Sequence, residues 1–98
     1  MTDTLPVAVA VRWYSPDEGG RRSGPPPGPR YTPTARFCHQ PLEAMFSVVL
    51  ELTDGTQGTV HPGFPENVPD FGERLARGET LLLHEGRAVV AEVVARHG

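Results

Sequence analysis

The sequence predicts a single-domain, all-β protein in which five or six short strands close into a barrel or pack as a sandwich. Three observations support this class. Short segments with an apolar residue at every second position recur along the chain, and glycine- and proline-containing turn signals separate them. The length of 98 residues allows one hydrophobic core and leaves no room for a second domain. We therefore interpret residues 1–98 as one β-barrel domain.

The first predicted strand covers residues 7–14. One face of this strand carries four apolar residues: Val7, Val9, Val11 and Trp13. Because successive side chains of a strand point to opposite faces, we expect this alternation to place one face against the core. Trp13 and Tyr14 lie on opposite faces, so one is expected to enter the core and the other to lie outside, where it could stack on a partner.

Residues 16–33 break the strand pattern. Ten of these eighteen residues are proline or glycine, including the run Pro25-Pro26-Pro27-Gly28-Pro29. Proline lacks an amide hydrogen and fixes φ, so we expect no strand pairing here and interpret the segment as a long surface loop. A solvated connector and a functional loop are both compatible with this composition.

Three strands are predicted in the middle of the chain, over residues 34–39, 46–52 and 57–61. The dipeptide Asp54-Gly55 joins the last two. It is a strong hairpin signal, and both positions of the expected turn require φ > 0. Residues 62–72 contain three prolines and two glycines and are interpreted as a loop.

The C-terminal part is expected to form a helical turn over residues 71–77 and strands over 80–84 and 87–95, with Glu85-Gly86 as a tight turn between the strands. The last segment has an alternative, because its valines also occur at helical spacing. Valine is β-branched and stiff at χ1, so we predict a strand.

The charge pattern narrows the chemistry. All nine basic residues are arginine, which excludes lysine-dependent chemistry such as a Schiff base. Residues 1–36 hold five arginines against three acids, and residues 37–98 hold four arginines against nine acids. The formal net charge of −3 does not favour a general nucleic-acid binder, but a local arginine patch could bind phosphate.

No residue pattern predicts an enzyme or a cofactor. Cys38 and His39 would point to opposite faces of a strand, so a buried, inert cysteine is the preferred interpretation. The four histidines lack metal-ligand spacing, and no metal site is expected. We expect a cytoplasmic protein without a membrane partner, because the chain has neither a signal-peptide pattern nor a long apolar run.

Two separated segments resemble the third domain of elongation factor Tu. Asp17-Glu18-Gly19-Gly20-Arg21, followed by Gly28-Pro29-Arg30, is similar to the opening of that domain. There a strand leads into Asp-Glu-Gly-Gly-Arg, a proline-containing loop and a Gly-Tyr-Arg-Pro turn. Residues 83–89, Leu-His-Glu-Gly-Arg-Ala-Val, resemble the closing hairpin of the family. The resemblance does not extend through residues 38–78.

The resemblance implies a small, antiparallel, six-stranded Greek-key barrel. It also implies that the loops carrying Arg21-Arg22 and Glu85-Gly86 approach one another. In the family these loops contribute to the surface that touches the T-stem backbone of aminoacyl-tRNA, and other faces meet the GTPase domain and the exchange factor. The sequence contains no phosphate-loop pattern, so GTP binding by this chain is not expected.

The favoured hypothesis is a non-enzymatic protein-binding domain, acting as an inhibitor, an immunity-type partner or an assembly subunit, because the C-terminal half is acidic. The alternative is contact with RNA, such as the T-stem of tRNA, through Arg21, Arg22 and Arg30. The prolines around these arginines would lower the entropy lost on binding. The candidate binding residues are Arg21, Arg22, Arg30, Tyr14, Glu85 and Gly86. An enzyme with an unrecognised site is a third hypothesis.

Overall fold

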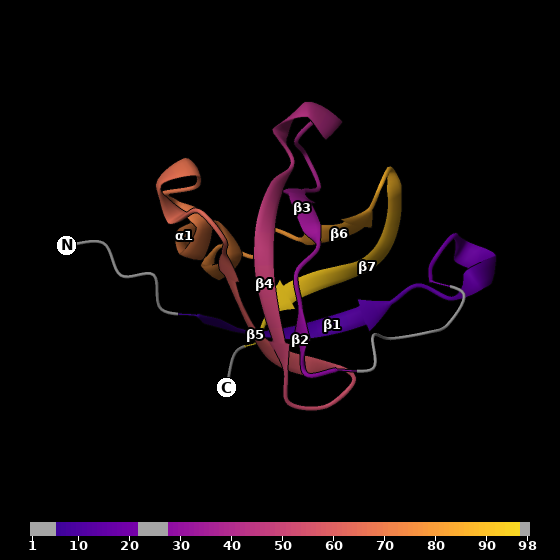
Figure 1. The fold of residues 1–98 in the computed structure, drawn as a ribbon. Coiled ribbons are helices and arrows are strands. Elements are labelled where there is room, and N and C mark those ends of the chain that lie inside the picture. Colours follow the sequence, from indigo (N-terminus) through magenta and orange to yellow (C-terminus); the bar gives the residue numbers. More distant parts are fainter. Residues whose placement is uncertain (1–5, 22–27, 97–98) are drawn as a thin grey trace.

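The structure is a computed structural model that describes residues 6–21 and 28–96 (Figure 1). The described strands are β1 (Val7–Trp13), β2 (Arg30–Tyr31), β3 (Thr34–Phe37), β4 (Phe46–Leu52), β5 (Gln57–Pro62), β6 (Leu81–Glu85) and β7 (Ala88–Ala95). The short helices are η1 (Pro16–Glu18), η2 (Leu42–Ala44), η3 (Pro65–Asn67) and α1 (Phe71–Ala76). The predicted all-β class is confirmed.

Six strands form a closed antiparallel barrel, and β2 is an additional strand. The sheet order is β2-β4-β3-β6-β7-β1-β5, and pairing of β4 with β5 closes it. Strands β3, β4 and β5 follow one another, and β6 then returns to pair with β3, as in a Greek key. The long connection of this Greek key, from β5 to β6, carries η3 and α1.

The barrel encloses one core, which is built by the predicted alternation. In β1, Val9 and Val11 are buried and Arg12 is exposed. Helix α1 contributes Phe71 and Leu75 to the same core. The remaining buried apolar residues come mainly from the barrel strands: Ala35, Phe37, Val48, Leu50, Val60, Val68, Leu81, Leu83, Val90, Ala91 and Val93. Core packing thus fixes the β5–β6 connection to the barrel.

The end of the proline-rich segment corrects the expectation that no strand pairing occurs within residues 16–33. Arg30 and Tyr31 pair with Glu51 and Leu50 of β4. The flanking prolines take part as acceptors: the Pro29 carbonyl accepts from the Leu52 amide at 2.6 Å, and the Pro33 carbonyl accepts from the Val48 amide at 3.1 Å. Because proline keeps its carbonyl, it can lie in a ladder that does not need its missing amide hydrogen.

The β4–β5 hairpin forms as predicted, but its turn differs from the prediction. No described residue other than glycine has a positive φ, and neither Asp54 nor Gly55 adopts one. Instead the Asp54 carboxylate accepts from the amides of Thr56 and Gln57, at 2.7 and 2.9 Å. These bonds lower the pKa of Asp54. Asp54 therefore shapes this turn through its side chain rather than through a left-handed backbone.

The last hairpin confirms a strand rather than a helix at residues 88–95. Its tight turn lies one residue later than predicted, at Gly86 and Arg87, and Gly86 has a φ of +62°. Glycine at the first position of a two-residue turn suits the twist of the flanking strands. The register shifts by one residue beside Leu83 and His84, where β7 carries an extra residue. No described helix is both long and apolar enough to span a membrane.

Candidate functional site

Helices η1 and α1 lie on different sides of the barrel (Figure 1), and one candidate region lies near each of them. The region near η1 contains two of the predicted binding residues, Arg21 and Glu85, and we call it the Tyr31 cluster: Trp13, Arg21, Tyr31 and Glu85. The Nε of Arg21 lies 2.7 Å from Oε2 of Glu85, which also accepts from the Tyr31 hydroxyl. The two predicted loops therefore meet. Burial, aided by this hydrogen bond to Glu85, raises the pKa of Tyr31.

Aromatic contacts complete the Tyr31 cluster. The guanidinium of Arg21 lies 5.7 Å from the centroid of the Tyr31 ring, within the range of a cation–π interaction. The rings of Trp13 and Tyr31 are 5.8 Å apart, and the Trp13 indole donates to the Gly55 carbonyl. Trp13 therefore packs against the hydrophobic core, whereas Tyr14 is not part of the core. Gly86 forms the turn beside Glu85.

The other predicted residues make separate contacts. Nη2 of Arg30 lies 2.9 Å from Glu51, its neighbour across the β2–β4 pairing. The Tyr14 hydroxyl donates to Glu92 at 3.0 Å, and the Arg12 guanidinium stacks 4.7 Å from the Tyr14 ring. Arg22 lies outside the described residues. Every predicted arginine that the structure describes is therefore paired with a carboxylate.

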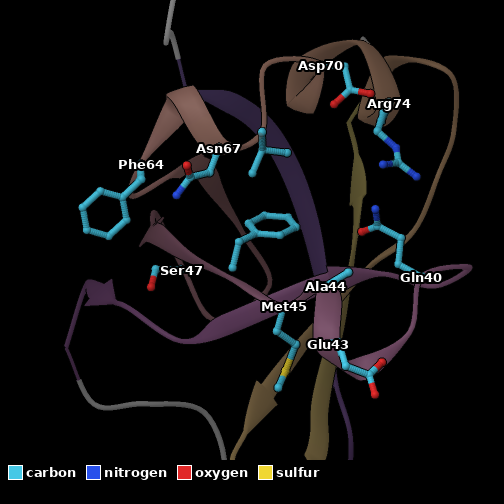
Figure 2. Close-up of a pocket in the computed structure, with 11 residues that line it drawn as sticks. Gln40, Glu43, Ala44, Met45, Ser47, Phe64, Asn67, Asp70 and Arg74 are labelled. Carbon is cyan, nitrogen blue, oxygen red and sulfur yellow. The ribbon is translucent and has the colours of Figure 1, made fainter.

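The second region is a pocket of about 540 Å³, which we call the end pocket (Figure 2). It lies between η2 with the start of β4 on one side and η3 with α1 on the other. Its lining residues are Gln40, Glu43, Ala44, Met45, Phe46, Ser47, Phe64, Asn67, Val68, Asp70 and Arg74. Figure 2 shows Asp70 and Arg74 on the α1 side and Glu43 and Met45 on the η2 side.

The apolar part of the end pocket extends from the core to the rim. Phe46 packs at right angles against the buried Phe71, with ring centroids 5.9 Å apart. Val68 is 9% exposed, whereas Phe64 is 57% exposed, the highest value among the large apolar side chains described. Phe64 follows Gly63, whose amide donates to the Ser47 carbonyl at 2.8 Å. Folding therefore holds an aromatic ring in solvent beside the pocket.

Several polar side chains of the end pocket have no partner among the described residues. Neither the Asn67 amide nor the Ser47 hydroxyl forms a side-chain hydrogen bond with another described residue. Asp70 precedes α1 but does not cap it through its side chain, and no described cation forms an ion pair with Asp70 or Glu43. The donors and acceptors of this group remain available to a ligand.

Arg74 differs from these residues because its charge is compensated. Its Nε and Nη2 lie 3.1 and 3.0 Å from Oε1 of Glu79, and its guanidinium stacks 4.4 Å from the centroid of the Phe37 ring. The hydrogen bond from Arg74 lowers the pKa of Glu79. Arg74 is therefore part of the wall of the pocket rather than a free cation.

A buried histidine connects the two regions. His84, which precedes Glu85, is 1% exposed, and its Nε2 accepts from Nε of Arg36 at 3.2 Å. Nη1 of Arg36 donates to the Gln40 carbonyl at 2.8 Å, in the turn that reaches the end pocket. Burial, followed by the charge of Arg36, lowers the pKa of His84.

The position of Cys38 differs from the expectation of a buried cysteine. Cys38 is half-buried, because β3 ends at Phe37 and Cys38 lies in the following turn. Within residues 6–21 and 28–96, no three histidine, cysteine or acidic side chains gather as metal ligands would. The expectation of a non-enzymatic protein stays a prediction.

Comparison with known proteins adds no relative. No family model matches the chain, and neither a curated protein nor a solved structure matches it. The resemblance to the third domain of elongation factor Tu therefore stays a prediction.

Sequence reasoning did not find the end pocket. Its walls come from residues 40–47 and 64–74, which are far apart in the chain and include the short helices η2, η3 and α1. One signal was present in the sequence: Phe64 stands between Gly63 and Pro65, outside any strand pattern, and so was a candidate exposed aromatic residue.

Proposed function

We propose that this protein is a non-enzymatic binding module that docks a segment of a partner protein in the end pocket. The observation that carries this proposal is the exposed Phe64 ring beside a pocket of about 540 Å³ whose polar side chains lack partners among the described residues. An exposed aromatic residue at a concave site is typical of a protein-binding hot spot. Burial of Phe64 by a partner would stabilise a complex.

The polar groups of the end pocket favour a polypeptide. The Asn67 amide can both donate to and accept from a peptide group, and the Ser47 hydroxyl can do the same. Small-molecule sites are predominantly apolar and enclose most of the ligand. Here six of the eleven lining residues are polar or charged, and Phe64 remains open to solvent. These features suit an extended segment that lies partly in the pocket.

The pairing of the arginines supports protein binding over the RNA alternative. Affinity for RNA would depend on the release of counterions from phosphates by uncompensated cations. Arg21 is paired with Glu85 and Arg30 with Glu51. A phosphate backbone would have to compete with both carboxylates.

A selection experiment tests the proposed function. The full chain is immobilised and screened with a phage-displayed library of random peptides, and recovered peptides are compared on the wild type and on Phe64→Ala. We expect peptides whose affinity falls about tenfold on Phe64→Ala, as for a hot-spot residue.

The selection has an internal control for folding. Because Phe64 is 57% exposed, its replacement should change the free energy of unfolding by less than about 0.5 kcal/mol. If no peptide is recovered, or if every recovered peptide binds Phe64→Ala as well as the wild type, docking in the end pocket is wrong.

A further inference from the structure

We infer that the segment docked in the end pocket carries a basic side chain next to an apolar one. This inference rests on the proposed function and specifies the chemistry of the partner. It depends on the charge of the pocket walls, on the state of Arg74 and on the exposed Phe64 ring.

The two chain segments that supply the lining of the end pocket are acidic. Residues 40–47 and 64–74 together hold four acids and one arginine, which gives a formal charge of −3. The charged residues of the lining itself are Glu43, Asp70 and Arg74. That value equals the formal net charge of the whole chain, so the remaining residues sum to zero. The excess of acidic residues thus falls in the two segments that supply the lining, where it would attract a positively charged segment.

Two carboxylates of the lining are available to such a segment. Asp70 lies on the α1 side and Glu43 on the η2 side (Figure 2). Neither has an ion-pair partner within the described part of the chain. A cation that enters the pocket could pair with either carboxylate without displacing an existing partner.

The cations near the pocket do not cancel this preference. Arg74 is held by Glu79 and by the ring of Phe37, at 3.0 Å and 4.4 Å. Arg77 also contacts Glu79, at 3.4 Å. An acidic segment would therefore have to replace Glu79 on Arg74 and would meet Asp70 and Glu43 at the same time.

Phe64 accounts for the apolar part of the inferred segment. Its ring offers one face for apolar contact, and an aromatic face also attracts a guanidinium or ammonium group. A segment that alternates basic and apolar side chains could place an apolar group on Phe64 and a cation near a carboxylate. A purely apolar segment would leave Asp70 and Glu43 without partners in a partly desolvated site, which costs free energy.

The test uses fluorescence anisotropy with synthetic peptides and the full chain. One labelled peptide alternates arginine and leucine, and a second replaces each arginine with glutamate. We expect the arginine peptide to bind and the glutamate peptide to show no saturable binding. Asp70→Asn and Glu43→Gln should each weaken the arginine peptide about threefold, as expected for a solvent-exposed ion pair. High salt should remove most of this difference, because it screens exposed charges.

A matched control separates the pocket from the general charge of the protein. Glu73 lies on α1, is exposed and does not line the pocket, so Glu73→Gln removes one negative charge outside the lining. The inference requires Glu73→Gln to weaken the arginine peptide less than Asp70→Asn does. If the two variants lose the same affinity for the arginine peptide, the peptide responds only to the net charge of the protein, and the inference is wrong.

The selection experiment distinguishes the two levels of the proposal. If the recovered peptides depend on Phe64 but are acidic or neutral, the inferred partner chemistry is wrong and the docking function stands. If no recovered peptide depends on Phe64, the docking function is wrong as well.

Discussion

The Tyr31 cluster and the end pocket both contain charged and aromatic side chains, yet they differ in how these groups are satisfied. In the Tyr31 cluster, the Glu85 carboxylate forms an ion pair with Arg21 and accepts a hydrogen bond from the Tyr31 hydroxyl. In the end pocket, Asp70 has no described ion-pair partner and Phe64 is 57% exposed. The first arrangement stabilises the fold, since it joins the proline-rich segment to the last hairpin. The second leaves groups that a partner can satisfy.

This difference shows why residue type alone does not identify a binding surface. Arg21 and Glu85 were predicted as binding residues because their loops resemble those of the third domain of elongation factor Tu and because prolines stiffen the arginine loop. Once folded, the same residues satisfy one another. An ionisable side chain marks a candidate site more strongly when its internal partners are missing.

The largest expected effect on stability comes from a substitution in the Tyr31 cluster that should leave binding at the end pocket unchanged. Tyr31→Phe removes the hydroxyl that donates to Glu85 and should lower the free energy of unfolding by about 1 kcal/mol. Peptide affinity at the end pocket should not change. Urea denaturation and fluorescence anisotropy measure the two quantities.

Tyr14→Phe is the matched control, because it also removes a tyrosine hydroxyl that donates to a glutamate. Arg12, whose side chain is 56% exposed, also pairs with Glu92, so the carboxylate keeps this partner after the substitution and we expect a change of less than about 0.5 kcal/mol in the free energy of unfolding. A loss of peptide affinity in Tyr31→Phe would show that the two regions are coupled, and the contrast between them would fail.

The strands were predictable from the sequence because their signal is local. Alternation over residues 46–52 coincides with β4, and alternation over residues 7–14 predicted β1, which ends one residue earlier, at Trp13. The β-branched valines correctly favoured a strand over a helix for β7. A barrel strand with one face in the core needs an apolar residue at every second position, and this alternation is visible in the sequence itself.

The turns and the pocket were less predictable because they depend on groups distant in the chain. The carbonyls of Pro29 and Pro33 join the ladder only because β4 lies beside them. Asp54 replaces a left-handed turn with side-chain hydrogen bonds. The end pocket forms only where residues 40–47 and 64–74 meet. The Greek-key connection brings these segments together, and no local sequence pattern predicts this contact.

A smaller effect is expected from pH, through the histidine that lies between the two regions. The pKa of His84 in the folded protein is below its ordinary value of about 6.5, so the unfolded chain binds the proton more readily. Neutral His84 therefore makes its full contribution to the free energy of unfolding above about pH 6.5, and this contribution is lost as the pH falls through the pKa of His84 in the folded protein. Protonation would also place a cation against Arg36.

Urea denaturation at a series of pH values measures this contribution. His84→Gln keeps an acceptor for Arg36 but cannot titrate, so it should be less stable than the wild type near pH 7 and lose less stability between about pH 7 and about pH 5. Parallel pH profiles for the two proteins would assign the acid sensitivity to other groups.

The smallest expected effect is on RNA binding, and it tests whether the Tyr31 cluster is a binding surface. If Arg21 is engaged within the fold, tRNA should show no retardation in a gel-shift experiment at low salt, and Arg21→Ala combined with Arg22→Ala should leave that result unchanged. A specific RNA complex would instead weaken steeply with salt and on this double substitution, since its affinity would come from released counterions. Retardation of that kind would mean that phosphate displaces Glu85 from Arg21, and the Tyr31 cluster would then be a binding surface in its own right.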